Sequence, residues 1–141
     1  MRAQRTLCAL LVLAVSASGA AAEDLASKMI MALNVNPGAV AFWAAGNDPP
    51  EGESPYAAEA RWTAAVRGAQ VMQAKGRLLQ AKGLARDGPW SSFAELMIQV
   101  SAEGEVAARA RDPEKAFEVG GRLYDACNGC HKTYVPRVPS S

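Results

Sequence analysis

The chain has 141 residues, and its 15 Lys and Arg residues against 14 Asp and Glu residues give a formal net charge of +1. A chain of this length typically forms one small domain with a core of its own. Charges this evenly balanced provide no basic field for nucleic acid, so we expect no nucleic-acid partner.

The first 22 residues are typical of a secretory signal peptide. Arg2 and Arg5 give a positive start, residues 6–16 are apolar, and small residues lead to a cleavage site after Ala22. A membrane anchor is the alternative, but this apolar run is short for a bilayer span, which needs about 20 residues. We therefore expect export to the periplasm and a single mature domain at 23–141, with no later segment apolar enough for a stable membrane anchor.

Cleavage at this site changes two counts. Loss of Arg2 and Arg5 lowers the formal charge from +1 to −1. Loss of Cys8 leaves two cysteines near the carboxyl terminus, Cys127 and Cys130. Any cysteine chemistry of the mature chain therefore depends on this pair.

The mature sequence has the periodicity of helices and not that of strands. Alanine is abundant, β-branched residues are sparse, and apolar positions recur at steps of three and four. The segment 24–46 is the least regular. Leu25 and Met29 favour a helix there, but residues 34–38 (Asn-Val-Asn-Pro-Gly) should interrupt it. Residues 46–55 are typical of a loop.

Ser54 and Pro55 form a helix start signal, an N-cap followed by proline at the first helical position. The helix should run to about residues 86–88, where Arg-Asp-Gly is a plausible stop. Its apolar stripe is rich in small residues, which suits close helix–helix contact in the core or in a homodimer. The stripe comprises Ala58, Trp62, Ala65, Ala69, Met72, Gly76 and Leu79.

The next helix opens at residues 88–91 and is weakened by Gly104, because glycine costs about 1 kcal/mol relative to alanine inside a helix. The last helix repeats the start signal with Asp112 and Pro113. Four helical segments with short connections predict an all-α, up-down-up-down four-helix bundle. We expect the last helix to turn one stripe inward, comprising Phe117, Gly120, Tyr124, Cys127 and His131.

The last helix carries Cys127-Asn128-Gly129-Cys130-His131, a C-x-x-C-H motif. Two thiols at this spacing can add across the two vinyl groups of a haem, and the imidazole that follows can ligate the iron. The motif predicts one covalent haem c, with thioether bonds to Cys127 and Cys130 and with His131 as the proximal iron ligand.

Three other interpretations of the motif are weaker. A structural zinc site needs four Cys or His ligands, and the mature chain has two Cys and one His. A redox dithiol favours a helix amino terminus in a βαβ setting, whereas this pair lies near a helix carboxyl end. A disulfide is compatible with export, but a bridge between residues three apart in one helix would constrain very little of the chain.

The alternating helices predict which side chains should meet the haem. His131 lies near the carboxyl end of the last helix, so the starts of the first and third helices and the end of the second should lie at the same level. Isolated cations such as Lys28 and Arg137 could pair with the haem propionates, although such cations are more often solvated surface. We expect the haem pocket to comprise Leu79 or Lys82, Trp90, Phe93, Met97 and Tyr134, with Met29 or Met31 from the first helix.

No methionine follows the motif, so an axial methionine would have to come from upstream. Met29 and Met31 are the best placed, and Met97 is a further candidate. One alternative is that these side chains only fill gaps in the core. The other is that the sixth position on the iron stays open.

Taken together, these features resemble the class II c-type cytochromes, the cytochrome c′ and c-556 group. Members of that family are exported four-helix bundles with C-x-x-C-H near the carboxyl terminus and an aromatic residue soon after it. Cys127, Cys130, His131 and Tyr134 match this pattern. The similarity extends over about residues 24–137. The chain resembles a divergent member, because Val-Pro follows the aromatic residue where the family often has a basic one.

The motif and the resemblance imply a periplasmic haem protein that passes single electrons between redox proteins. The alternative is a protein that binds or senses a small gas, NO or CO, at an open sixth position. We expect no enzyme activity. A peroxidase-like haem protein would need a distal proton-transfer group, and the single histidine, His131, is already assigned to the iron.

Overall fold

The computed structural model describes residues 23–135. The predicted signal peptide and its cleavage site lie outside the described residues, as does Arg137. Within 23–135 the chain forms helices and loops and no strand. The elements are a first helix, Glu23–Gly46, that contains the π-helical turn η1 (Met31–Val35) and α2 (Asn36–Gly46), followed by α3 (Pro55–Leu79), α4 (Trp90–Ala110) and α5 (Pro113–Tyr134).

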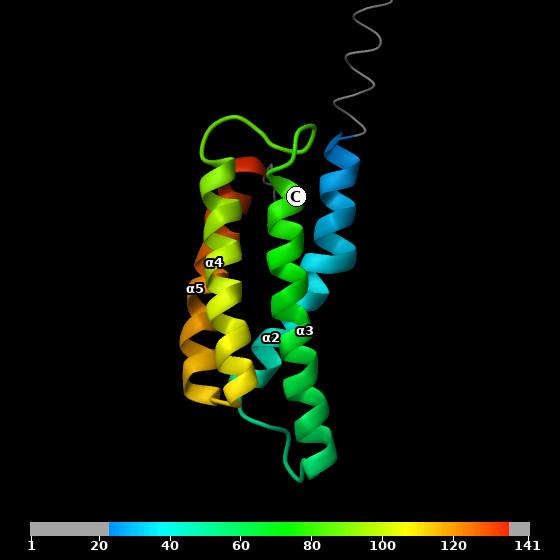
Figure 1. The fold of residues 1–141 in the computed structure, drawn as a ribbon, viewed down its shortest axis with the longest axis vertical. Helices are drawn as coiled ribbons and strands as arrows, with labels where there is room; N and C mark the ends of the chain where they lie inside the picture. Colours follow the sequence, from blue (N-terminus) through cyan, green and yellow to red (C-terminus); the bar gives the residue numbers. More distant parts are fainter. Residues whose placement is uncertain (1–22, 136–141) are drawn as a thin grey trace, which may run out of the picture.

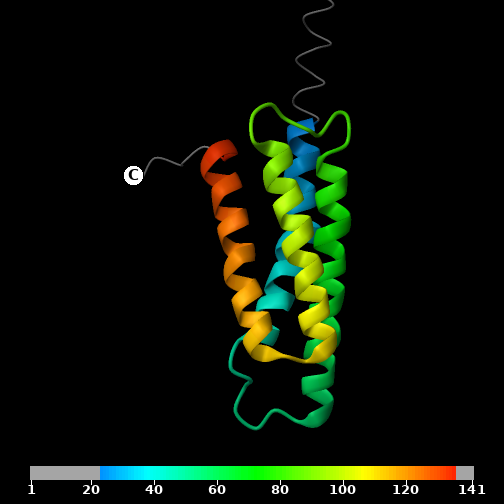
Figure 2. The ribbon, with the colours of Figure 1, turned by 60° about the vertical axis from the view of Figure 1, so that its left-hand side comes forward.

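The four helices pack together in chain order, and the ring closes because α2 also packs on α5. Figures 1 and 2 show that each helix runs antiparallel to the next. The start of the first helix, the end of α3, the start of α4 and the end of α5 therefore lie at one end of the bundle. The predicted all-α class and the four packed helices are confirmed.

The predicted interruption of the first helix at residues 34–38 is wrong. The chain continues as a helix through Pro37 because η1 widens the turn before it, with the Asn36 N–H donating to the Met31 carbonyl. Pro37 then occupies the first turn of α2. Inside a continuous helix a proline lacks the N–H for a bond to the preceding turn and its ring crowds a carbonyl of that turn, so the widened turn of η1 directly before Pro37 makes room for it. Such π-helical turns are rare and occur frequently at functional sites.

The predicted helix starts are confirmed by their caps. Ser54 Oγ accepts a hydrogen bond from Ala57 N at 3.2 Å, and the Asp112 carboxylate accepts one from Lys115 N at 2.9 Å. The predicted end of α3 is too late, because the helix stops at Leu79. Its last carbonyl accepts the Trp90 indole N–H at 2.7 Å, which ties the end of α3 directly to the start of α4.

The core runs along the axis of the bundle. Among its largest fully buried side chains are Phe42, Met72, Val100, Val119 and Leu123. The predicted stripe of α3 is buried apart from Ala58, which is half-buried. The stripe therefore packs inside the bundle, and the homodimer stays a separate prediction.

Glycines allow the closest approaches in this core. A Cβ built on Gly68 would lie 2.3 Å from the Gly38 carbonyl oxygen, so the first helix and α3 meet backbone to backbone. Gly104, predicted as a weak point of its helix, receives the ring of Phe42, whose Cζ would lie 2.8 Å from an added Cβ. The packing of a large aromatic side chain thus depends on the absence of a side chain at Gly104.

One helix in the described part of the chain, Glu23–Gly46, is long and apolar enough to cross a membrane by length and composition alone, with a mean hydropathy of 1.2. The expectation that no segment after residue 22 would meet this criterion is therefore wrong. Core helices of soluble proteins meet it as well, and this helix packs against α3 and α5.

Candidate haem-attachment site

The motif lies in the last turns of α5, at the edge of the face that the helix buries. That buried face comprises Ala116, Val119, Gly120, Leu123 and Ala126. Cys127 and Cys130 continue it as half-buried residues packed against the core cluster. The motif is therefore part protein interior and part surface.

The predicted inward stripe of α5 is wrong at three of its five positions. Phe117 is 67% exposed, Tyr124 is 58% exposed, and His131 is exposed as well. These residues are spaced by seven, so they share one face of the helix, and that face lies beside the buried one. In the bundle, α5 is oriented so that its face with Ala116, Val119, Gly120, Leu123 and Ala126 packs against the neighbouring helices.

The two thiols are free and are not joined in a disulfide. Burial raises the pKa of the Cys127 thiol, and the neighbouring Cys130 adds a smaller contribution in the same direction. Burial also raises the pKa of Cys130, against an opposing effect of the positive charge on Arg86. A redox dithiol depends on a lowered thiol pKa, so these surroundings speak against that interpretation.

The donor set also speaks against a closed zinc site. Among residues 23–135, no group of three or more His, Cys, Asp or Glu side chains is placed to hold a metal ion. The two thiols and His131 come from one short stretch of α5. This arrangement suits a ligand that is itself bound covalently at two points and then ligated through its iron.

Helix α4 forms the wall of the site on one side. The Phe93 ring lies against the motif, with its Cε1 2.7 Å from the position that a Cβ on Gly129 would occupy. The rings of Trp90 and Tyr134 meet edge to face with centroids 5.0 Å apart, and Tyr134 Oη donates a hydrogen bond to the Asp87 carbonyl at 2.5 Å. The structure therefore places three of the predicted pocket residues around the end of α5.

The remaining predicted pocket residues differ in their exposure. Leu79 and Met97 are buried, and the Met97 Cε lies 3.2 Å from the position of a Cβ on Gly76. Met29 is 51% exposed, whereas Met31 lies in η1, is half-buried and packs against the core cluster. Of the three candidate methionines, Met29 has the least covered side chain.

Arg86 is a charged residue of this end that the sequence did not single out. Its guanidinium carbon lies 4.9 Å from the centre of the Trp90 ring, and its Nη2 donates to Asp24 Oδ1 at 3.0 Å. Arg86 could have been predicted as a residue of this site from its position in the α3–α4 loop, because the topology puts that loop at the same end of the bundle as His131. Lys28, which was considered as a propionate partner but is more typical of solvated surface, is exposed and pairs with Asp24 at 2.7 Å.

The residues present fit a covalently bound haem. Two free thiols and an exposed imidazole share the end of α5, and exposed apolar side chains, among them Met29, Tyr124 and Val135, belong to the elements at that end. An apolar prosthetic group would cover such surfaces, which otherwise stay in contact with water.

The chain was compared with protein-family models, with curated proteins and with solved structures, and none of them matches it.

Proposed function

We propose that the chain is an exported c-type haem protein that carries one covalent haem c and transfers single electrons between periplasmic redox proteins. The observation that carries this proposal is the C-x-x-C-H motif. Its two thiols are free and half-buried, and its histidine is exposed, all at the end of one helix in a four-helix fold. The resemblance to class II c-type cytochromes supports the same assignment through Cys127, Cys130, His131 and Tyr134.

Each residue of the motif has a defined role in this proposal. Cys127 and Cys130 hold the haem through thioether bonds, and His131 ligates the iron from the proximal side. The bound haem supplies the reversible one-electron change of its iron. The protein adds orientation and exclusion of water, because Phe93 packs on the motif and the rings of Trp90 and Tyr134 pack against each other at the start of α4.

The sixth iron ligand is assigned to the first helix. Met29 is half exposed although its side chain is apolar, and a haem bound at the same end of the bundle would provide the partner that the side chain lacks. Met31 is the second choice, since η1 holds it partly within the core. Methionine together with histidine is the axial pair of many electron-transfer haems, and it raises the reduction potential.

The test is the absorption spectrum of the exported, reduced protein before and after addition of CO. A c-type spectrum that CO leaves unchanged supports a six-coordinate electron carrier. A shift to a CO complex favours the alternative function, binding of a small gas at an open sixth position. Absence of covalent haem in a host that attaches c-type haem would refute the proposal, and the double variant Cys127→Ser/Cys130→Ser provides the haem-free control.

Variants of the methionines identify the sixth ligand. If Met29 binds the iron, Met29→Ala converts a low-spin spectrum to high-spin and opens the iron to CO. Met31→Ala and Met97→Ala are the matched controls, because each removes one thioether from the same end of the bundle. An unchanged spectrum in Met29→Ala would exclude Met29 as ligand.

A further inference from the structure

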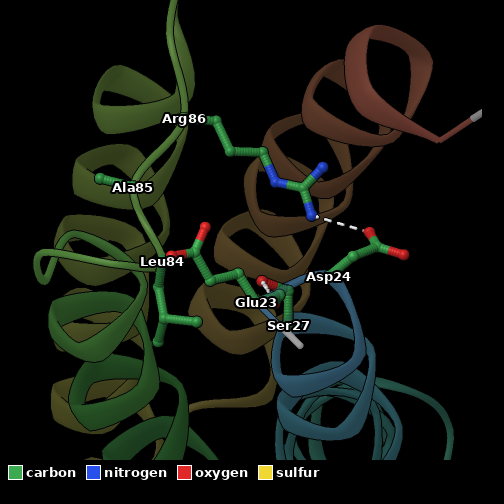
Figure 3. Close-up of a pocket in the computed structure, with 6 residues that line it drawn as sticks. All are labelled: Glu23, Asp24, Ser27, Leu84, Ala85 and Arg86. Atoms are coloured by element: carbon green, nitrogen blue, oxygen red, sulfur yellow. Dashed lines mark hydrogen bonds and ion pairs between the residues drawn. The ribbon is translucent and has the colours of Figure 1, made fainter. Parts of the chain in front are cut away.

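A small cavity of about 210 Å³ lies between the start of the first helix and the α3–α4 loop. Figure 3 shows Arg86 reaching from this loop toward Asp24 on the first helix. This is the end of the bundle to which the motif belongs. The cavity is lined by Glu23, Asp24, Ser27, Leu84, Ala85 and Arg86.

Arg86 is held in place by an aromatic ring that also contacts α5. Its guanidinium lies over Trp90, and the edge of the same indole meets Tyr134, three residues after His131. Tyr134 in turn donates to the carbonyl of Asp87, the residue next to Arg86. The position of the Arg86 side chain is therefore coupled to the last turn of the helix that bears the motif.

The guanidinium has hydrogen-bonding capacity to spare. Arginine carries five N–H donors in a fork that suits a carboxylate, and within residues 23–135 Arg86 uses one of them, toward Asp24. Asp24 is bound twice, because Lys28 also pairs with it, and these two partners lower the pKa of the Asp24 carboxyl. Asp24 would thus keep a cation beside it even if Arg86 changed partner.

The other acid of the cavity lies on a different wall. Glu23 Oε1 is 3.7 Å from the position that a Cβ on Gly83 would occupy, in the part of the loop before Arg86. Ser27 is buried, and its hydroxyl donates to the Glu23 carbonyl at 3.1 Å. Among the residues that line the cavity, Arg86 is therefore the cation available to an incoming carboxylate.

A haem carries its two vinyl groups and its two propionates on different edges of the ring. With the vinyl groups bonded to α5, the propionates must lie away from Cys127 and Cys130, toward other elements at the same end of the bundle. Resting on the haem attachment proposed above, we infer that Arg86 binds a haem propionate through its free N–H donors, and that Asp24 is its partner while no haem is present. Lys28, considered for this role in the sequence, pairs with Asp24, and Arg137 lies outside the described residues.

Resonance Raman spectroscopy of the reduced haem protein tests the inference, because the bending bands of the propionates respond to their hydrogen bonds. In Arg86→Gln these bands shift, and the midpoint potential falls because a positive charge near the iron is lost. Arg77→Gln is the matched control, since it removes the same charge from an exposed position in the last turn of α3, and it leaves the bands at the wild-type position.

The outcomes separate this inference from the proposed function. If the wild-type protein carries no covalent haem, the proposed function fails and the inference fails with it. If the wild type carries haem and Arg86→Gln has wild-type bands, only the role of Arg86 is refuted. Should Arg86→Gln not accumulate, Arg86→Lys is measured instead. Lysine keeps the positive charge but lacks the planar pair of N–H donors that arginine offers to a carboxylate. Shifted propionate bands in this variant therefore support the inference, and unchanged bands overturn it.

Discussion

The two ends of the bundle are built from the same four helices, but the protein fills them to different degrees. At the end away from the motif, which we call the closed end (Phe42, Trp43, Glu53 and Arg61), these four side chains have partners within the protein. The Phe42 side chain is 1% exposed, and the Trp43 indole N–H donates to the Gly120 carbonyl at 3.0 Å. At the motif end (Met29, Trp90, Cys127 and His131), thiols, imidazole and thioether are partly or largely exposed.

At the closed end, one arginine joins the loop after the first helix to the end of that helix. Arg61 binds both carboxylate oxygens of Glu53, at 2.8 and 2.9 Å, and donates to the carbonyls of Ala44 and Ala45 at the end of the first helix. A cation at a helix carboxyl terminus satisfies carbonyls that have no partner within the helix and interacts favourably with its dipole. The helix-terminal carbonyls at the closed end are therefore satisfied within the protein, although Val106 and Phe117 expose apolar side chains there. At the motif end, the chemically reactive side chains, the two thiols and the imidazole, stay partly or largely exposed.

The largest difference between the two ends should appear on truncation of Phe42. Its ring fills the centre of the core against Gly104, so Phe42→Ala should lower the free energy of unfolding by about 3–5 kcal/mol. Met29→Ala in the haem-free chain should change it by less than about 0.5 kcal/mol, because that side chain is half exposed. Urea unfolding measures both, and equal effects would contradict the comparison.

The glycine contact between the first helix and α3 gives the next largest effect. In Gly68→Ala the new methyl group would lie 2.3 Å from the Gly38 carbonyl oxygen, so the helices must separate, at a cost of about 1–3 kcal/mol. Gly121→Ala is the control, since a Cβ there meets nothing within 4 Å. It should stabilise α5 by about 0.5–1 kcal/mol. Thermal unfolding would count against this account if both variants shifted in the same direction.

A smaller effect is expected for the link between α5 and the α3–α4 loop. Tyr134→Phe keeps the ring edge against Trp90 but removes the hydrogen bond to the Asp87 carbonyl. The expected loss is about 0.5–1.5 kcal/mol, together with faster amide hydrogen exchange in residues 80–89. Tyr56→Phe, at a highly exposed position, should leave both quantities unchanged. Unchanged amide hydrogen exchange of the α3–α4 loop in Tyr134→Phe would show that this hydrogen bond does not stabilise the loop.

The smallest effect is the pH dependence of the closed end. The hydrogen bond from Arg61, with a smaller contribution from its charge, holds the pKa of Glu53 below the ordinary value of 4.5. A lowered carboxyl pKa stabilises the fold above the pKa of the unfolded chain, and this stabilisation is lost as the pH falls through the folded-state value.

Urea midpoints measured between about pH 6 and pH 3 test this dependence. They should fall less steeply in Glu53→Gln than in the wild type. Glu51→Gln, which removes an exposed carboxylate of the same loop, should keep the wild-type profile. Parallel profiles for the wild type and Glu53→Gln would exclude this ion pair as the source of the dependence.

The sequence predicted much of this fold because the responsible signals are local. The caps at Ser54 and Asp112 act within one helical turn, and the spacing of small residues in α3 reports which face is buried. The π-helical turn before Pro37 escaped prediction, since a proline within a helical pattern usually ends the helix. Both η1 and α2 pack against α3, and this packing between distant segments favours one continuous helix over two.

The orientation of α5 was predicted wrongly. Its sequence offers two neighbouring stripes, and the one with Phe117 and Tyr124 carries the larger side chains. The small residues beside it permit closer packing, and the Gly120 carbonyl also accepts the Trp43 indole N–H. The periodicity of α5 therefore contains the buried face, at residues 116, 119, 120, 123 and 126, but the packing against the neighbouring helices decided between the two stripes.

What the sequence determined by itself is the chemistry of the motif, because Cys127, Cys130 and His131 lie within five consecutive residues and any helix brings them together. What only the tertiary structure decided is their surroundings. Arg86 reaches the motif end because α3 stops at Leu79 and the loop after it crosses toward the first helix. Such contacts join residues far apart in the chain, and their geometry depends on how whole helices pack, which no local pattern of residues encodes.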